Sequence, residues 1–216
     1  MIKGPIININ NRFNEVFLFF DLQNSEFSPD IRIIDTFSSH FSFHSFNKQS
    51  NDSLLSHSHQ LNNLVIVSSE NPLYALAVTD TSIKNNMATS IAHIYICNRP
   101  IVKTLYHTVN VTSMEAELFA IRCGINQATN SQGISKIIIV TDLIHLAKII
   151  FDSSFYPFQV HTAFILSDFR KLFTLNLNNE IKFWECPSQC DWSLHKVVNK
   201  ETKLFNLIPH YSCKML

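Results

Sequence analysis

The hydrophobic pattern of the chain predicts three consecutive strands in its middle part. Nearly continuous runs of apolar, β-branched and aromatic residues occupy positions 73–80, 90–97 and 101–111, as expected of strands that are covered on both faces. The connection 98–100 ends in a proline, which fixes φ and favours a turn. Strands this close in sequence are expected to pair as an antiparallel meander.

The next segment, 112–129, has the spacing of an amphipathic helix. Thr112 or Ser113 is placed to cap its start. Two small residues beside the apolar stripe, Ala120 and Gly124, would let the helix approach a sheet closely. The stripe itself comprises Met114, Leu118, Ile121 and Ile125.

The remaining pattern completes an α/β fold. A buried strand is expected over 134–142, then helices over 143–151 and 159–173, a strand over 180–187 and a helix from about residue 198. A strand, a helix and a strand in this order imply a right-handed crossover to a parallel neighbour. We therefore predict a mixed five-stranded sheet, an antiparallel meander plus two parallel strands, flanked by helices.

The N-terminal third shows no sustained period. Residues 1–71 are predicted to form a poorly defined N-terminal extension or linker. Within them, 36–63 is biased toward Ser, His, Asn and Phe and is expected to be linker or poorly ordered. Residues 72–207 are the predicted domain, and 208–216 are a C-terminal tail.

Composition narrows the class of protein. The chain has 216 residues, of which 46% are hydrophobic, which is enough for one good core. Its formal net charge is zero, so a polyanion would have to be held by a local patch or through metal ions. Its five cysteines are an odd number and are expected to be reduced thiols. No apolar run is long enough for a signal segment or a membrane span, so we expect an intracellular protein without a membrane partner.

Acidic residues end two of the predicted strands: "AVTD" ends at Asp80 and "IVTD" at Asp142. If these strands are neighbours, both carboxylates lie near one edge of the sheet. At 100° per residue, Glu117 lies about 60° from the centre of the apolar stripe and can face the sheet. Glu115 lies about 100° to the other side and is expected to be solvated.

Three carboxylates brought together would repel one another, and one would have to take up a proton unless a cation neutralised them. Mg²⁺ prefers a few carboxylates and keeps its other positions for water and phosphate oxygens. Two such ions about 4 Å apart would activate a water and stabilise the leaving oxygen of a displacement at phosphorus. Taken singly, each acid is also consistent with a plain strand end or helix surface.

These acids stand in motifs that resemble those of the type 1 ribonuclease H family. "TDTS" looks like its first strand, "AELFAI" like its acidic helix motif and "VTDL" like its third acidic element. By this resemblance Asp80, Glu117 and Asp142 take the places of the first three catalytic acids. The segment 180–205 resembles the last strand, the histidine-bearing loop and the final helix. The likeness extends over about residues 73–205, and it includes the ribonuclease H domains encoded in retrotransposon polyproteins.

The resemblance implies a metal-dependent endonuclease that hydrolyses the RNA strand of RNA–DNA hybrids and leaves 5′-phosphate and 3′-hydroxyl ends. It implies two Mg²⁺ or Mn²⁺ ions, an RNA–DNA hybrid as partner, and a reverse transcriptase domain in a parent polyprotein, of which residues 1–71 would be a remnant. His195, placed before the final helix, would be the histidine that moves protons or releases product, or would simply be packed beside Trp192. Thr81, Ser82 and Lys148 are candidates for nucleic-acid contacts.

The pattern departs from the family at Asn199, where a fourth acid is usual. Asn199 can still bind a cation through its neutral oxygen, but the lost charge should weaken the second metal position. Glu201 could substitute only if the final helix began differently, because two helical residues are about 200° apart. The alternative function is therefore a catalytically degenerate module of the same fold, which binds hybrid or is only structural.

Overall fold

The structure, a computed structural model, describes residues 37–46, 53–109, 111–145, 147–148, 165, 167–173 and 178–205. The expectations for residues 1–36 and for the tail 208–216 lie outside these ranges. The helices expected over 143–151 and 159–173 are described in part, with helical backbone at 144–145, 147–148, 165 and 167–173. Every helix among the described residues is too short or too polar to cross a membrane.

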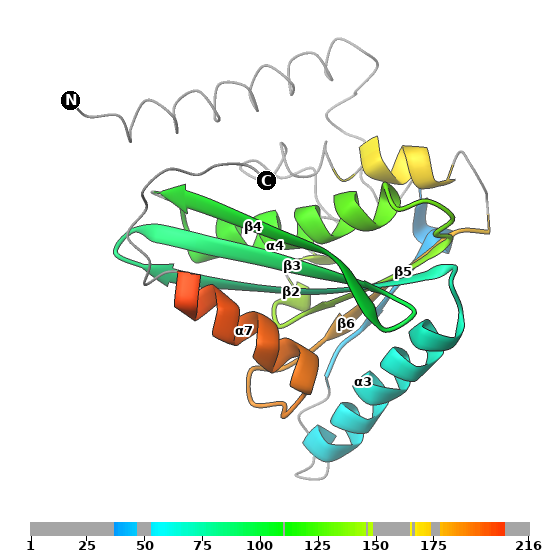
Figure 1. The fold of residues 1–216 in the computed structure, drawn as a ribbon, viewed down its shortest axis with the longest axis horizontal. Coiled ribbons are helices and arrows are strands. Elements are labelled where there is room, and N and C mark those ends of the chain that lie inside the picture. The colour runs from blue at the N-terminus through cyan, green and yellow to red at the C-terminus, as the bar shows by residue number, and fades with distance from the viewer. Residues whose placement is uncertain are drawn as a thin grey trace.

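A six-stranded mixed sheet forms the centre of the molecule, in the order β1-β6-β5-β2-β3-β4 (Figure 1). Its strands are β1 (Phe41–His44), β2 (Tyr74–Lys84), β3 (Met87–Ile96), β4 (Arg99–Val109), β5 (Lys136–Thr141) and β6 (Glu180–Glu185). The helical elements are η1 (Ser38–His40), α3 (Ser53–Glu70), α4 (Ser113–Thr129) and α7 (Ser193–Phe205). The sheet contains all five strands that the sequence predicts, together with one that it does not.

Strands β2, β3 and β4 form the expected antiparallel meander. Asn85 and Asn86 join the first pair and Cys97 and Asn98 the second, all with positive φ. Two residues in the left-handed region give a turn whose twist matches that of the strands. The turn expected at 98–100 is therefore wrong by one residue. Its proline lies in β4, an edge strand of the sheet, where a missing N–H is tolerated.

The other half of the sheet is parallel. Strand β5 pairs with β2 and with β6, and β6 pairs with β1, all in parallel. Helix α4 makes the crossover from the meander to β5. This arrangement confirms the predicted mixed α/β sheet, although the number of strands is six rather than five.

The expectation of linker over 36–63 is wrong. Strand β1 pairs residue by residue with β6, from Phe41 opposite Ile181 to His44 opposite Trp184. Phe43 stacks on Phe183, with ring centroids 5.0 Å apart, and the His44 ring stacks on Trp184 at 4.2 Å. Both faces of this short strand are thus held by ring contacts that a composition argument does not reveal.

Helix α3 also falls partly within the segment expected to be linker. Its buried residues are His57, Leu61 and Ser68, so only one of the three is apolar. The His57 ring nitrogen Nε2 lies 2.5 Å from the carbonyl oxygen of Glu185, which ties the helix to the end of β6. A helix anchored in this way has a weak hydrophobic period, and the sequence pattern did not indicate it.

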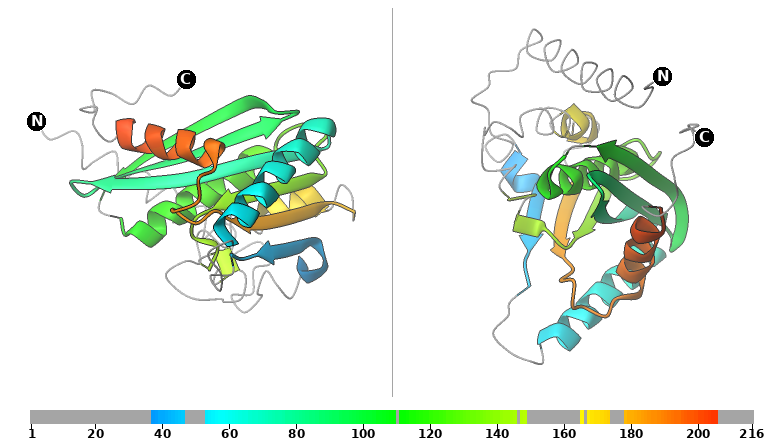
Figure 2. Two further views of the ribbon diagram at one scale, coloured as in Figure 1. Left: turned by 90° about the horizontal axis from the view of Figure 1, so that it is seen from below. Right: turned by 90° about the vertical axis from the view of Figure 1, so that its left-hand side faces the viewer.

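The sheet separates two layers of helix (Figure 2). Ile137 and Ile139 of β5 pack in the core cluster that contains α4, whereas Ile138 and Val140 pack in the cluster that contains residues of α3 and α7. Helix α4 approaches its face closely: a Cβ added at Gly124 would lie 3.2 Å from Cγ2 of Thr79. This close approach is the one that the sequence predicts.

Helix α7 begins earlier than expected, at Ser193 rather than near residue 198. The N–H of Lys196 donates to the carbonyl oxygen of Trp192, which is the first hydrogen bond of the helix. Residues 193–197 contain no helix breaker, and their backbone continues the helix toward its N-terminus. His195 therefore lies in the first turn of α7 and not in a loop before it.

Candidate metal centre

Two acids meet where the parallel pairing of β2 and β5 ends. Val78 of β2 pairs with Val140 of β5. Asp80 and Asp142 each follow two residues later, so the two carboxyls reach the same level. Strand β2 itself continues to Lys84, with Asp80 opposite Ile91 of β3, so the expectation that this strand ends at Asp80 is wrong. Asp80 is buried, with 4% of the residue exposed, and Asp142 is half-buried.

Helix α4 supplies the third carboxyl from its first turns. Thr112 is the N-cap, and its hydroxyl oxygen accepts from the N–H of Glu115, whose carboxylate in turn accepts from the N–H of Thr112. This capping box fixes Glu115 at the helix start. Glu117, two residues further on, is turned inward and is 6% exposed.

His195 completes the group from α7. Its Nε2 lies 3.7 Å from Oδ1 of Asp80, and the side chain is 3% exposed. One ligand atom from each of Asp80, Asp142 and His195 lies within 4.8 Å of the others. Glu117 is outside this tight group, but it is near enough that the charges of both aspartates act on it. Four side chains from four elements thus face one another.

The electrostatics of the group favour a cation. Burial raises the pKa of Asp80 to about 6, although the hydroxyl of Thr202 partly offsets the rise. Burial, with the added repulsion of Asp142 and Asp80, raises the pKa of Glu117 to about 9. Burial and the charge of Asp80 also raise the pKa of Asp142. Without a positive charge among them, these carboxyls cannot all be ionised at neutral pH.

Several polar atoms of the group have no protein partner. Oε2 of Glu117, Oδ1 of Asp142 and Nε2 of His195 are buried, and none makes a hydrogen bond among the described residues. Buried polar atoms without partners are costly and call for an ion or a water. The carboxylate oxygens are the donors that a hard divalent cation prefers, so these residues fit such an ion.

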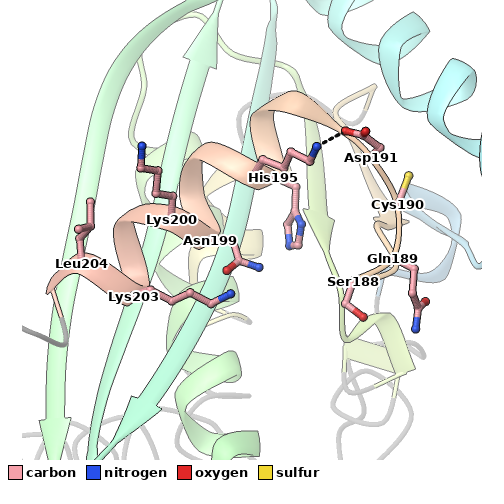
Figure 3. Close-up of a pocket in the computed structure, with 10 residues that line it drawn as sticks. Ser188, Gln189, Cys190, Asp191, His195, Asn199, Lys200, Lys203 and Leu204 are labelled. Carbon is pink, nitrogen blue, oxygen red and sulfur yellow. Dashed lines mark ion pairs between the residues drawn. The ribbon is translucent and has the colours of Figure 1, made fainter.

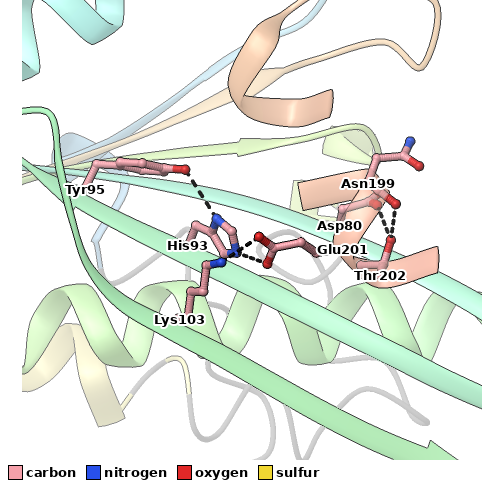
Figure 4. Close-up of polar contacts among 7 residues, drawn as sticks. All are labelled: Asp80, His93, Tyr95, Lys103, Asn199, Glu201 and Thr202. Atoms are coloured by element: carbon pink, nitrogen blue, oxygen red, sulfur yellow. Dashed lines mark hydrogen bonds and ion pairs between the residues drawn. The ribbon is translucent and has the colours of Figure 1, made fainter. Parts of the chain in front are cut away.

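Thr202 is a member of the site that the sequence analysis missed. Its hydroxyl is fully buried and lies 2.9 Å from Oδ2 of Asp80 and 2.8 Å from the carbonyl oxygen of Asn199 (Figure 4). Through this hydrogen bond it helps to orient the Asp80 carboxyl. A helical-wheel signal existed: His195, Val198 and Thr202 follow the i, i+3, i+7 spacing of the buried face of α7.

Asn199 and Glu201 do not join the carboxyls directly. Asn199 meets Thr202 through its backbone carbonyl, and its side chain lines a groove along α7 (Figure 3). Glu201 is bound elsewhere: its carboxylate accepts from Nε2 of His93 at 3.0 Å and from Nζ of Lys103 at 2.5 Å (Figure 4). Glu201 therefore does not replace the fourth acid, which removes that option from the sequence analysis.

The three expected nucleic-acid contacts lie in different places. The hydroxyl of Thr81 lies 3.2 Å from the carbonyl oxygen of Ala116 and links β2 to α4, and Ser82 is half-buried next to it. Lys148 donates to the hydroxyl of Ser45 at 2.6 Å, beyond the end of β1. Because β6 and β5 separate β1 from β2 in the sheet, Lys148 is not gathered with Asp80.

The cysteines stay free thiols among the described residues. Cys97, Cys123, Cys186 and Cys190 form no disulfide. Cys213 lies outside the described ranges.

No protein-family model matches the chain, and a search of curated proteins finds no match. Among solved structures, the ribonuclease H1 of the halophilic archaeon Halobacterium salinarum is 13% identical, with a TM-score of 0.40 over 53% of this chain and 86% of that one. The protease-reverse transcriptase of prototype foamy virus is 13% identical, with a TM-score of 0.48 over 65% of this chain and 22% of that one. A foamy viral protease-reverse transcriptase in complex with double-stranded DNA is also 13% identical, with a TM-score of 0.44 over 63% of this chain and 93% of that one.

These likenesses are too distant to assign an activity. What the chain itself shows is an antiparallel meander, a crossover helix and parallel strands, with helices on both faces of the sheet. By this topology its fold is ribonuclease H-like, and its buried Asp80, Asp142 and His195 form a group that could hold a metal ion.

Proposed function

We propose that this chain is a metal-dependent endonuclease that hydrolyses the RNA strand of RNA–DNA hybrids inside the cell. The observation that carries the proposal is the convergence of three carboxyls with raised pKa values, two of which have buried oxygens without a hydrogen-bond partner. Ionised carboxylates at such short range repel one another, and bound divalent cations reduce this repulsion.

Asp80, Glu117 and Asp142 are the proposed ligands of two Mg²⁺ or Mn²⁺ ions, with Asn199 as a neutral oxygen donor on the side of the second ion. When bound, such ions make a water nucleophilic and neutralise the charge that develops on the phosphate. The protein's own contribution is to hold the carboxyls at one edge of a rigid sheet and helix, so that little reorganisation is needed during the reaction.

His195 is proposed to move a proton. Burial lowers its pKa, so the ring is neutral at pH 7 and its partnerless Nε2 can accept a proton. Attack of water on the phosphorus breaks the bond to the 3′ oxygen, which leaves with a proton as a 3′-hydroxyl, while the phosphate stays on the 5′ end. The water gives up one proton, which His195 is placed to receive, and the leaving 3′ oxygen takes up one proton from bulk water, so the two transfers balance.

Recognition of the hybrid is proposed from the sequence resemblance. Contacts to 2′-hydroxyls across the shallow minor groove would distinguish RNA from DNA. Thr81 and Ser82, which follow Asp80 in β2, are proposed for these contacts, and Lys148 for a more distant phosphate. The same resemblance leads us to propose that the ribonuclease H-like part over 72–207, which β1 and α3 extend on its N-terminal side, is joined in a parent polyprotein to a reverse transcriptase domain.

The first test is cleavage of a labelled RNA–DNA hybrid in Mg²⁺ or Mn²⁺, with RNA and DNA duplexes as controls. Asp80→Asn should lower the rate at least a thousandfold, because it removes the charge shared by the metal ligands. Glu180→Gln, at the opposite end of β6, is the matched control and should cleave like the natural chain. Metal-dependent cleavage that survives Asp80→Asn would reject the proposed centre.

A second candidate function is a degenerate module without activity, which Asn199 favours because Glu201 is bound to His93 and Lys103 and supplies no replacement charge. Asn199→Asp should raise the cleavage rate at limiting Mg²⁺ if the natural chain is a weakened enzyme, because it returns a negative charge to the second metal position. We expect at least a fivefold gain, measured from initial rates over a Mg²⁺ series. An inactive natural chain that stays inactive as Asn199→Asp would favour the degenerate module.

A further inference from the structure

An open groove of about 600 Å³ runs along α7 beside the metal centre. Ser188 and Gln189 line one wall, and one face of α7 lines the other (Figure 3). On that face His195, Asn199 and Lys203 are each four residues apart and therefore follow one stripe of the helix. Because His195 belongs both to the groove and to the metal group, the groove begins at the metal centre.

The groove carries positive charge. It contains three lysines and a single carboxylate, that of Asp191. Lys196 forms an ion pair with Asp191, so these two charges cancel. Among the described residues, no carboxylate forms an ion pair with Lys200 or Lys203. In a chain of zero net charge, this is the kind of local patch that a polyanion would need.

Lys203 is the cation directed at the centre. Its side chain extends from α7 on the same side as that of Asn199 (Figure 3), and the Cα–Cβ bonds of a helix tilt toward its N-terminus, where His195 lies. Its charge reaches the metal ligands, since it offsets part of the rise that burial causes in the pKa of Asp80. Its side chain is exposed, so the ammonium is free to meet a ligand.

We propose that this groove binds the phosphodiester backbone of the cleaved strand next to the scissile phosphate, with Lys203 as its anchoring cation. The proposal rests on the proposed function for the identity of the strand. Eight residues of helix separate Lys203 from His195, which is about 12 Å along the axis. A strand that rises about 3.4 Å per nucleotide places a phosphate opposite Lys203 about three to four nucleotides from the metal centre.

A phosphodiester fits the groove better than an acidic peptide does. The groove is continuous with a site that is itself proposed to hold a phosphate. A strand bound at that site would continue into the groove along α7. Lysine binds phosphate as a point charge without reading a base. Lys203 should therefore contribute to affinity and position, and not to sequence preference.

The test is fluorescence anisotropy of a labelled RNA–DNA hybrid, titrated in EDTA at a series of salt concentrations so that no cleavage occurs. Lys203→Gln should weaken binding several-fold and reduce the slope of log K against log salt by about one, as expected for one lost phosphate contact. Lys171→Gln removes the same charge from an exposed lysine outside the groove and is the matched control. It should change neither quantity.

Equal binding and equal slope in Lys203→Gln and the natural chain would overturn the groove proposal. So would the absence of hybrid binding, or binding of an acidic peptide as tightly as the hybrid. The cleavage assay separates this proposal from the proposed function. If the chain cleaves the hybrid and Lys203→Gln does not change binding, the proposed function stands and the groove proposal is rejected. If hybrid binding depends on Lys203 but no cleavage is seen, the groove proposal stands and the proposed function is rejected.

Discussion

The residues of the metal centre differ in how readily each can be identified from the sequence. Asp80 and Asp142 stand out because each ends an apolar run, and Glu117 because its helical phase turns it toward the sheet. No comparable sequence feature points to Thr202, since a threonine within a helix is commonplace. Its role follows only from the register between α7 and β2, which the sequence does not contain.

Thr202 provides a prediction at this scale. Thr202→Val keeps the shape of the side chain but removes the hydroxyl that lies 2.9 Å from Oδ2 of Asp80. A hydrogen bond to a charged group contributes about 1.5–3 kcal/mol, so the half-saturating Mg²⁺ concentration should rise about tenfold or more. Calorimetric titration with Mg²⁺ measures this without relying on cleavage.

Thr202→Ser is the control for that change. It keeps the hydroxyl and removes one buried methyl group, which costs about 1 kcal/mol of stability but leaves Asp80 with its partner. Metal affinity should then return to within about twofold of the natural chain. Unchanged Mg²⁺ affinity in Thr202→Val would show that Thr202 only packs.

At the scale of elements, long runs were predictable and short or weakly patterned elements were not. The three meander strands and β5 can be recognised from their nearly continuous apolar sequence. Strand β1 has only four residues. Its aromatic rings stack on rings of β6, a strand that lies 140 residues further along the chain. Helix α3 buries histidine and serine beside its leucine, so its hydrophobic period is too weak to be recognised.

The start of α7 shows how one boundary changes the interpretation of a residue. With the helix expected from about residue 198, His195 belonged to a loop. Because the helix begins at Ser193, the backbone holds His195 rigidly against Asp80. A histidine fixed in this way is suited to hold or pass a proton at one place, and less suited to swing between substrate and solvent.

At the scale of the whole molecule, the topology was predictable because the order of strands and helices leaves few alternatives. Short connections favour the meander, and a strand, a helix and a strand favour a right-handed parallel crossover. The convergence of acids then follows from the fold, since the register of the parallel neighbours β2 and β5 brings Asp80 and Asp142 to the same level. The added strand β1 extends this sheet without altering the site.

Stability should depend on pH and metal together. The pKa of Asp80 rises from 3.8 to about 6 on folding, so the folded state holds this proton more tightly than the unfolded state. Stability is therefore lost as the pH rises from about 4 to 6, by about 3 kcal/mol from this group. Glu117 and Asp142 shift in the same direction. The lowered pKa of His195 acts oppositely, since it costs stability as the pH falls below its ordinary value of 6.5.

Mg²⁺ should relieve the charge that ionisation of the acids creates. We expect Mg²⁺ to raise the melting temperature by several degrees at pH 8 and by much less at pH 5, where protons compete for the same carboxyls. Thermal melts in EDTA and in Mg²⁺ at both pH values measure this difference. Asp80→Asn should reduce the response at pH 8, and an equal metal response at both pH values would contradict a carboxyl site.

Strand β1 has a consequence for any shortened form of this protein. It covers the outer edge of β6, whose backbone groups would otherwise be open to pairing with another chain. A chain cut at residue 72, where the sequence predicts the domain to begin, would lose β1 and α3 and expose that edge beside Ile181 and Phe183. Four residues that look like linker thus replace the six-residue edge of β6 by a shorter edge strand, which lowers the tendency of the sheet to self-associate.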